Sequence, residues 1–218
     1  SDGELKKVLS LGFKPNKIVY SGIGKKFEEL KFAISKNILL INVESESELK
    51  NIQKLAKKFR KKVSVGLRLN PNIDAKTNTK ISTGRVQDKF GLDSNNIIKI
   101  LNKFKNSRNI EIKCLSVHIG SQITQNKPYN NVLVAINKIL LKSKFKFEYI
   151  DLGGGMGIKY VKDNKRLDYS KLSKNIYKFS KKNNCKIIFE PGRSIVGNTA
   201  VLLTKVIYIK NSSNKKFI

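Results

Sequence analysis

The stretch Ile188-Phe189-Glu190-Pro191-Gly192-Arg193 places a carboxylate and a guanidinium three residues apart, directly after an apolar run. Two more polar clusters also follow apolar runs: Asp151-Leu152-Gly153-Gly154-Gly155, and His118-Ile119-Gly120-Ser121-Gln122, which holds the only histidine. In a parallel α/β barrel the carboxyl ends of the strands meet at one mouth, so clusters far apart in sequence become neighbours. We therefore expect the three clusters to surround a single ligand.

Short apolar runs alternate with longer amphipathic segments along the chain. This alternation is typical of βαβ units around a parallel sheet, whose strands are covered on both faces. A complete (β/α)8 barrel takes about 250 residues, so the 218 residues predict a partial TIM barrel of about six βα units. Six runs are predicted to be its strands: Lys17–Tyr20, Ile38–Val43, Val63–Leu69, Ile112–His118, Tyr149–Leu152 and Lys186–Phe189.

Two segments depart from this alternation. Asp74–Gly91 is polar and has no clean periodicity, and a loop of that length is usually functional or disordered. Ala200–Ile209 is strongly β-forming where a barrel would place a helix, which predicts one long strand. We therefore expect a partial barrel over residues 1–197, followed at 198–218 by the first strand and tail of a C-terminal β domain.

The net charge of +29 raises the question of a polyanionic partner. Only six of the 45 basic residues are arginines, and the lysines are spread through helix-like segments such as Lys50–Phe59. That distribution favours a solvated lysine-rich surface, with no specific nucleic-acid partner. Non-specific attraction to polyanions remains open.

Other features of the composition predict a soluble cytoplasmic protein. Cys114 and Cys185 lie in separate apolar runs without metal-ligand spacing, as expected for buried thiols in a reducing compartment. No apolar run approaches the ~18 residues that a membrane span needs, so we expect no membrane partner. With one histidine and separated cysteines, a zinc site is poorly supported, and so is a serine hydrolase, since no G-x-S-x-G sequence occurs.

Each residue of the strand-end clusters can be interpreted either as part of a cofactor site or as having only a structural role. Gly153, Gly154 and Gly155 could expose backbone N–H groups to a phosphate, or could simply allow a tight turn. Arg193 could supply the counter-charge to that phosphate or form a surface ion pair. Glu190 could hold a pyridinium nitrogen protonated, as a pyridoxal phosphate enzyme requires, or cap a helix. His118 could stack on a flat cofactor or be an ordinary buried side chain.

Taken together, the sequence resembles the diaminopimelate decarboxylase family, within the fold-type III decarboxylases that use pyridoxal 5'-phosphate. The resemblance runs over nearly the whole chain, and the last three of its motifs carry the proposed site. The motifs are Ser1–Leu5, Ser21–Lys25, Ile41–Ser45, Leu67–Pro71, Ile81–Gly84, Lys89–Gly91, His118–Ile123, Asp151–Gly155 and Glu190–Arg193.

The resemblance implies removal of carbon dioxide from the D-configured centre of meso-diaminopimelate to give L-lysine, by a homodimer. It implies catalytic roles for His118 and Glu190, with His118 against the cofactor ring and Glu190 at the ring nitrogen. It also implies that Arg193 lies near the substrate carboxylate, and that Arg68 and Lys89 line the mouth. The cofactor-binding residues implied are His118, Ser121, Gly153, Gly154, Gly155, Glu190, Pro191, Gly192 and Arg193.

Two elements of the family pattern are not found in these residues. The lysine that binds the cofactor covalently lies in a Tyr-Ala-x-Lys-Ala-Asn phrase, which does not occur. The Cys-Glu-Ser phrase of the family's C-terminal β domain does not occur either. We therefore expect the 218 residues to be an incomplete part of the enzyme and inactive alone. Open alternatives are an ornithine, arginine or carboxynorspermidine decarboxylase, or a non-catalytic regulatory homologue.

Overall fold

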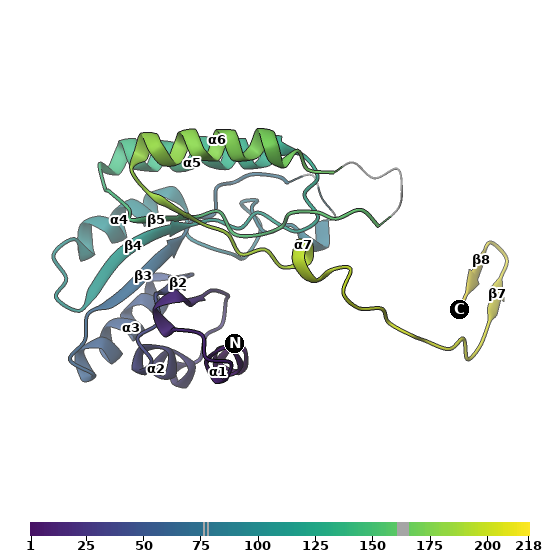
Figure 1. The fold of residues 1–218 in the computed structure, drawn as a ribbon, viewed down its shortest axis with the longest axis horizontal. Helices are drawn as coiled ribbons and strands as arrows, with labels where there is room; N and C mark the ends of the chain where they lie inside the picture. The colour runs from purple at the N-terminus through teal and green to yellow at the C-terminus, as the bar shows by residue number, and fades with distance from the viewer. Residues whose placement is uncertain (76, 78, 161–165) are drawn as a thin grey trace.

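A six-stranded parallel sheet organises the chain, with its strands in sequence order from β1 to β6 (Figure 1). The computed structural model describes residues 1–75, 77, 79–160 and 166–218. All six predicted strands are present, with ends that differ from the prediction by at most two residues. They are β1 (Val19–Tyr20), β2 (Leu40–Val43), β3 (Val63–Arg68), β4 (Ile110–Ser116), β5 (Tyr149–Asp151) and β6 (Lys186–Ile188).

Helices connect the strands and lie outside the sheet, so that each crossover returns the chain to start a parallel strand (Figure 1). Neighbouring helices pack on one another, α1 on α2, α2 on α3, α4 on α5 and α5 on α6. The long helices are α1 (Asp2–Ser10), α2 (Phe27–Ser35), α3 (Glu46–Lys58), α4 (Ser94–Phe104), α5 (Asn126–Ser143) and α6 (Tyr169–Asn183), and two 3-10 turns occupy Pro15–Lys17 and Thr79–Ile81.

Helix α3 shows why these segments are helical. The Ser45 side chain caps its first turn by accepting from the Glu48 N–H at 3.2 Å. Acidic residues stand in its first turn and lysines in its last, where each charge complements the helix dipole. Leu49, Ile52 and Leu55 recur at helical spacing and are buried against the sheet.

The sheet curls, so that its two edge strands approach each other at their carboxyl ends. Ser21, which follows β1, donates a hydrogen bond from its hydroxyl to the carboxylate of Glu190, which follows β6. The edges are not paired with each other, and a groove of about 450 Å³ separates them, lined by Val19, Ile188 and Phe189 among others. This curl makes the sheet a partial TIM barrel, as predicted, and it gathers the strand ends at one mouth.

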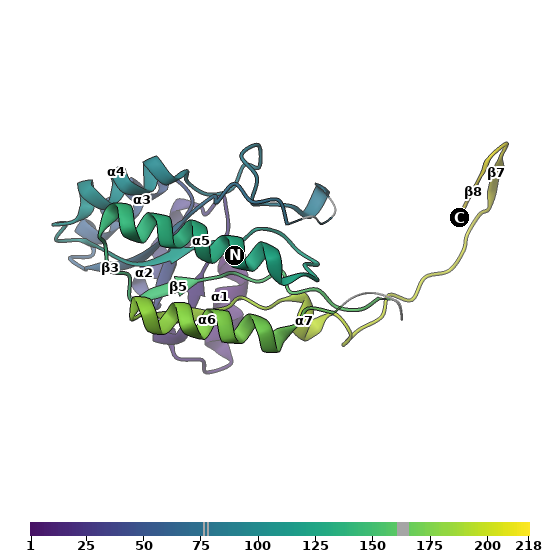
Figure 2. The same ribbon diagram turned by 90° about the horizontal axis from the view of Figure 1, so that it is seen from above.

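The prediction of one long strand at Ala200–Ile209 is wrong. The structure assigns no strand between residues 200 and 209, and Val201 and Leu203 are each 94% exposed. A strand requires a partner for its backbone groups, and no described segment pairs with this one. Figures 1 and 2 show it leading from the short helix α7 (Arg193–Val196) to a hairpin of β7 (Lys210–Ser212) and β8 (Lys215–Phe217). The proposed domain boundary at 197/198 stays a prediction.

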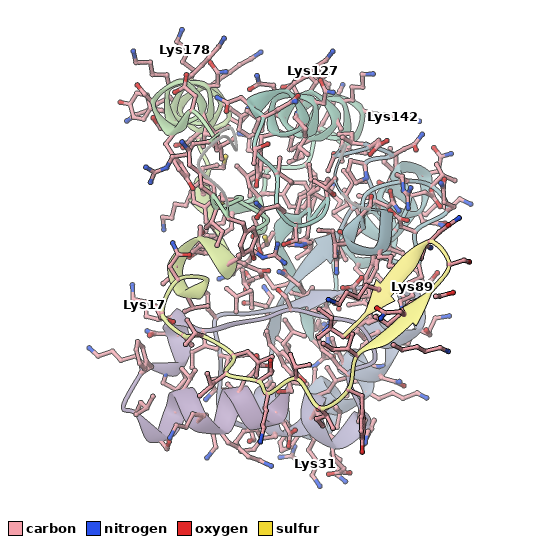
Figure 3. The ribbon with its side chains drawn as sticks, turned by 90° about the vertical axis from the view of Figure 1, so that its right-hand side faces the viewer. Lys17, Lys31, Lys89, Lys127, Lys142 and Lys178 are labelled. Carbon is pink, nitrogen blue, oxygen red and sulfur yellow. The ribbon has the colours of Figure 1, made fainter. Side chains whose placement is uncertain are left out.

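Lysine side chains project from several sides of the molecule, as the labelled ones in Figure 3 illustrate, so the positive charge is dispersed over many elements. Among the helices of the described residues, none is both long enough and apolar enough to cross a membrane.

Candidate active site

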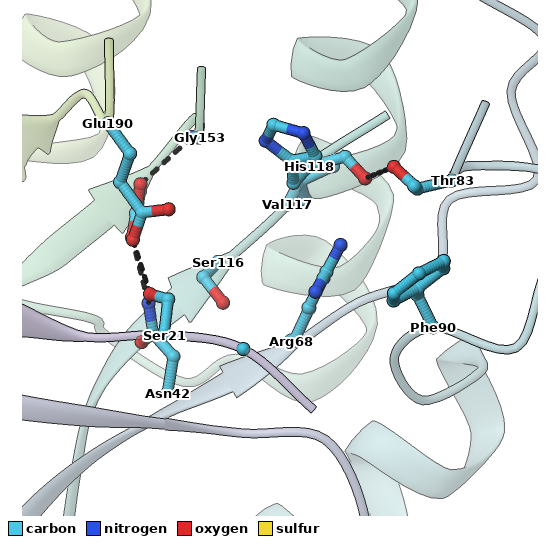
Figure 4. Close-up of a pocket in the computed structure, with 12 residues that line it drawn as sticks. Ser21, Asn42, Arg68, Thr83, Phe90, Ser116, Val117, His118, Gly153 and Glu190 are labelled. Carbon is cyan, nitrogen blue, oxygen red and sulfur yellow. Dashed lines mark hydrogen bonds between the residues drawn. The ribbon is translucent and has the colours of Figure 1, made fainter. Parts of the chain in front are cut away.

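A pocket of about 320 Å³ opens at the carboxyl ends of the strands (Figure 4). Each of the six strands contributes to its wall, either by one of its last two residues or by the residues that follow it. The lining residues are Ser21, Gly22, Asn42, Arg68, Thr83, Phe90, Ser116, Val117, His118, Asp151, Gly153 and Glu190. This is the convergence that the three sequence clusters predict.

His118, two residues after β4, has its ring fixed by a backbone group. Its Nδ1 accepts a hydrogen bond from the Gly154 N–H at 3.1 Å, so this nitrogen carries no proton and the neutral ring is protonated on Nε2. Burial lowers the pKa of His118, and the positive charge of Arg68 lowers it further. The result is a neutral, flat imidazole held at the pocket wall, which suits stacking on an aromatic ring.

The glycines after β5 form a turn that tolerates no larger residue. Gly153 and Gly155 have φ values of 63° and 89°, in the left-handed region that favours glycine. A Cβ atom on Gly154 would lie 2.1 Å from the carbonyl oxygen of Glu190. The Glu190 N–H also donates to the Gly153 carbonyl at 2.8 Å, so the turn and the Glu190 backbone pack directly against each other.

Tyr129 of α5 stabilises this glycine turn through a buried hydrogen bond. Its ring is almost completely buried, and its hydroxyl donates to the Gly154 carbonyl at 2.8 Å. Burial raises the pKa of Tyr129 well above its ordinary value, so the hydroxyl stays a donor at neutral pH.

We predict that Tyr129→Phe lowers the free energy of unfolding by about 1–2 kcal/mol, because it leaves a buried carbonyl without its donor. Denaturant titration of the protein that carries this chain measures the loss. Tyr177→Phe is the matched control, since Tyr177 is 63% exposed on α6. An equal effect of the two substitutions would show that the hydrogen bond to Gly154 contributes nothing.

Glu190 is oriented by a directed chain of hydrogen bonds (Figure 4). The buried Asn42 donates from its amide nitrogen to the Ser21 hydroxyl at 2.8 Å, and Ser21 donates onward to Glu190 Oε1. Because the Ser21 oxygen accepts one bond and donates the other, the Glu190 oxygen must be an acceptor. This leaves the second carboxylate oxygen of Glu190 available to the pocket and to its neighbour Asp151.

Asp151 is the last residue of β5 and is only 1% exposed. Its two oxygens accept from the Gly153 N–H and the Asn42 amide, each at 2.9 Å. Burial raises the pKa of Asp151 to about 8, and the adjacent Glu190 charge adds to the effect.

Arg68 and Glu44 connect the strand ends to the predicted loop. Arg68 Nη1 donates to Glu44 Oε1 at 2.6 Å, and the Gly91 N–H donates to Glu44 Oε2 at 3.0 Å. The Arg68 guanidinium also lies 4.9 Å from the Phe90 ring centroid. The described part of Asp74–Gly91 therefore packs beside the pocket, and residues 76 and 78 lie outside the description. Lys89 is exposed and is not among the lining residues, contrary to expectation.

Arg193 belongs to a second cluster beside the glycine turn. Its Nη1 donates to Gln122 Oε1 at 3.4 Å, and its guanidinium lies 5.8 Å from the Tyr160 ring centroid. The Ile123 N–H donates to the Gly155 carbonyl at 2.8 Å, which ties the His118–Ile123 segment to the glycines. Ser121 is half-buried in this segment, next to Gln122.

The structure thus divides the nominated residues between two adjacent places. His118, Gly153 and Glu190 line the pocket, while Ser121, Gly155 and Arg193 lie with the second cluster and Gly154 contacts both Glu190 and His118. Pro191 and Gly192 are exposed, and neither is a lining residue of the pocket.

No lysine is among the described residues that line the pocket. Lys25, near the end of β1, is buried with its side chain 2% exposed, and its ammonium is fully engaged. It donates to the carbonyl of Asn42 at 2.7 Å and pairs with Glu48 at 2.8 Å. Within the described residues, no group of three or more His, Cys, Asp or Glu side chains could hold a metal ion.

The pocket residues fit a flat aromatic ring that carries a basic nitrogen. A neutral imidazole provides a face for stacking, and an oriented carboxylate provides an acceptor for a ring N–H. Two buried polar atoms that line the pocket, Asn42 Oδ1 and Ser116 Oγ, have no partner among the described atoms, so the wall retains polar groups for a ligand.

Sequence reasoning assigned no role to four residues of this site, namely Ser21, Asn42, Asp151 and Tyr129. The first three stand at strand ends, so the rule that located His118 and Glu190 applies to them equally. Tyr129 had no such signal, because a buried aromatic residue on a helix usually belongs to the core.

Comparison with known proteins places this geometry in a family. Diaminopimelate decarboxylases from Zymomonas mobilis and Aquifex aeolicus are 36% and 38% identical to this chain. Both matches cover the whole chain and 53% of the relative. The crystal structure of diaminopimelate decarboxylase from Helicobacter pylori complexed with L-lysine is 36% identical, with a TM-score of 0.89 over 99% of this chain and 55% of that one. The chain thus spans about half the length of the curated relatives it matches. Residues 1–197 match the family model described as the pyridoxal binding domain of pyridoxal-dependent decarboxylases, and the chain belongs to that family.

Proposed function

We propose that the protein carrying this chain removes carbon dioxide from meso-diaminopimelate to give L-lysine, with pyridoxal 5'-phosphate as cofactor. The observation that carries the proposal is the pocket itself, where His118 and Glu190 present a flat neutral ring and an oriented carboxylate. Pyridoxal phosphate, when bound, supplies a protonated pyridine ring that accepts the electron pair left by departing carbon dioxide. A cytoplasmic homodimer is part of the proposal.

The chain's own residues would hold and orient this cofactor. His118 would cover one face of the ring, and Glu190 would accept from the ring N–H and so keep the nitrogen protonated. In the turn Gly153–Gly155 the Gly153 and Gly154 N–H groups already bond Asp151 and His118. The Gly155 backbone and the Ser121 hydroxyl would therefore be the donors to the phosphate. Gly192 and Pro191 would lie beside the phosphate, and Arg193 would offer its guanidinium to the phosphate and the substrate carboxylate.

The substrate assignment is supported by the relatives. Diaminopimelate decarboxylases reach 36–38% identity over the whole chain. A viral arginine decarboxylase structure is 24% identical with a TM-score of 0.71, a likeness that extends to the fold alone. Release of carbon dioxide from meso-diaminopimelate, ornithine and arginine, measured side by side on the protein that carries this chain, tests the proposal. Release from ornithine or arginine but not from meso-diaminopimelate would refute it.

We predict that Arg193→Ala weakens pyridoxal phosphate binding by about one to two orders of magnitude. Charge-assisted hydrogen bonds of this kind contribute roughly 1.5–3 kcal/mol, and about 1.4 kcal/mol corresponds to tenfold in affinity. Arg193→Lys keeps the charge and loses the planar fork, so its loss should be smaller. Fluorescence titration with pyridoxal phosphate measures both. Unchanged affinity in the alanine variant would remove Arg193 from the binding site.

A further inference from the structure

The pocket contains two neighbouring carboxyl groups, those of Asp151 and Glu190, which would repel each other if both were ionised. Asp151 ends β5, Glu190 follows the neighbouring strand β6, and both line the pocket. Asn42 connects them, because its amide nitrogen donates to Asp151 Oδ2 at 2.9 Å and to the Ser21 hydroxyl at 2.8 Å, which in turn donates to Glu190. Two ionised carboxylates cannot form a hydrogen bond, because neither has a proton to donate. Two carboxyl groups placed side by side in a buried site therefore attract each other only if they share one proton, as neighbouring carboxyl groups do when both cannot ionise.

The difference in burial indicates which residue holds that proton. Glu190 Oε1 accepts from the Ser21 hydroxyl, which itself accepts from Asn42. Asp151 accepts from the Gly153 N–H and the Asn42 amide, so both carboxyl groups have donors. Asp151 is however only 1% exposed while Glu190 is half-buried, and burial disfavours the charged form of a carboxyl group. The difference in burial favours a charged Glu190 beside a neutral Asp151.

We propose that Asp151 is a positioning residue that stays protonated at neutral pH and donates its proton to Glu190 in a hydrogen bond. In this arrangement the Glu190 carboxylate accepts two hydrogen bonds, one from the Ser21 hydroxyl and one from the protonated Asp151. Glu190 is thereby kept ionised and aimed into the pocket, ready to accept from a ring N–H. The inference depends on the proposed function only for the identity of that ring nitrogen.

The charges around Asp151 are consistent with this state. The charge of Glu190 raises the pKa of Asp151, and the buried Cys114 thiol of β4 has its own pKa raised by burial and by Asp151. Across the pocket stand the neutral His118 and the Arg68 guanidinium, which is already paired with Glu44. Within the described residues, hydrogen bonds to neighbouring groups lower the pKa values of other carboxyl groups, those of Asp2, Glu4, Glu46, Asp88 and Glu148.

The location of the proton is measured without cofactor, by infrared spectroscopy of the protein that carries this chain. We expect the carbonyl band of a protonated carboxylic acid at pH 6, which is lost as the pH rises through about 8. Asp151→Asn should abolish the band at every pH. Glu190→Gln removes the neighbouring negative charge, so the band should persist but disappear at a lower pH. A band that survives in Asp151→Asn, or is absent from the unmodified protein at pH 6, would overturn the proposal.

Pyridoxal phosphate titration gives an independent readout. Asp151→Ala loses the donor to Glu190, so affinity should fall about tenfold, which corresponds to roughly 1.4 kcal/mol. Asparagine is neutral and keeps an N–H donor, so Asp151→Asn should restore most of that loss. If asparagine is as damaging as alanine, an ionised Asp151 is required and the proposal is wrong. If the unmodified protein does not bind pyridoxal phosphate, the proposed function fails, while the infrared result still decides where the proton lies.

Discussion

Glu190→Gln is expected to lower turnover by roughly 10²–10⁴-fold, the range found when a positioned acid or base is removed. Glutamine keeps the shape of the side chain and can still hydrogen-bond, but it carries no negative charge to stabilise a proton on the ring nitrogen. Affinity for pyridoxal phosphate should change by less than about tenfold, because the stacking and phosphate contacts remain. Carbon dioxide release per bound cofactor, measured in the protein that carries this chain, separates the two effects.

Ser21→Ala provides the matched control for this prediction. It removes the donor to Glu190 Oε1 while leaving the carboxylate in place. A neutral hydrogen bond to a charged group contributes about 1.5–3 kcal/mol, so we expect a smaller loss of turnover than for Glu190→Gln. If Glu190→Gln instead releases the cofactor while turnover per bound cofactor stays normal, Glu190 only shapes the pocket.

The strands and half of the site follow from local sequence. Each strand is a short apolar run bounded by turn-forming residues, and a buried parallel strand needs no more than that to be recognised. His118 and Glu190 could be nominated because a polar residue directly after such a run lies at the mouth of a barrel. The local pattern of apolar runs and polar ends therefore predicts both the fold and the positions of His118 and Glu190 at the pocket.

What the sequence could not supply depends on contacts between distant residues. The role of Asp151 arises from its approach to Glu190, 39 positions later, and the same carboxylate next to three glycines also suits an ordinary turn. Tyr129 supports the Gly154 carbonyl from another element. Ala200–Ile209 has strong β propensity, yet propensity cannot provide a partner strand, and the segment is not a strand in the structure.

Gly154→Ala should cost about 3 kcal/mol in cofactor binding, roughly a hundredfold, at the upper end of what overpacking usually costs. The φ angle of Gly154 does not exclude alanine, so the cost is steric. The added Cβ would meet the Glu190 carbonyl oxygen at 2.1 Å and the carbonyl carbon at 3.1 Å. These are backbone atoms that cannot rotate away, so either the glycine turn or the strand end that carries Glu190 must move. Fluorescence titration with pyridoxal phosphate measures the effect.

Two other glycines separate the possible causes of such a loss. Gly3 lies in α1, where a Cβ would contact only the Ser1 hydroxyl at 3.8 Å, so Gly3→Ala should leave cofactor affinity unchanged. At Gly192 a Cβ would meet no protein atom within 4 Å. Any affinity lost in Gly192→Ala must therefore come from the approach of the ligand, as expected if the phosphate lies beside this residue. If Gly154→Ala binds as tightly as Gly3→Ala, the turn adapts freely, and its close packing against Glu190 does not position the carboxylate.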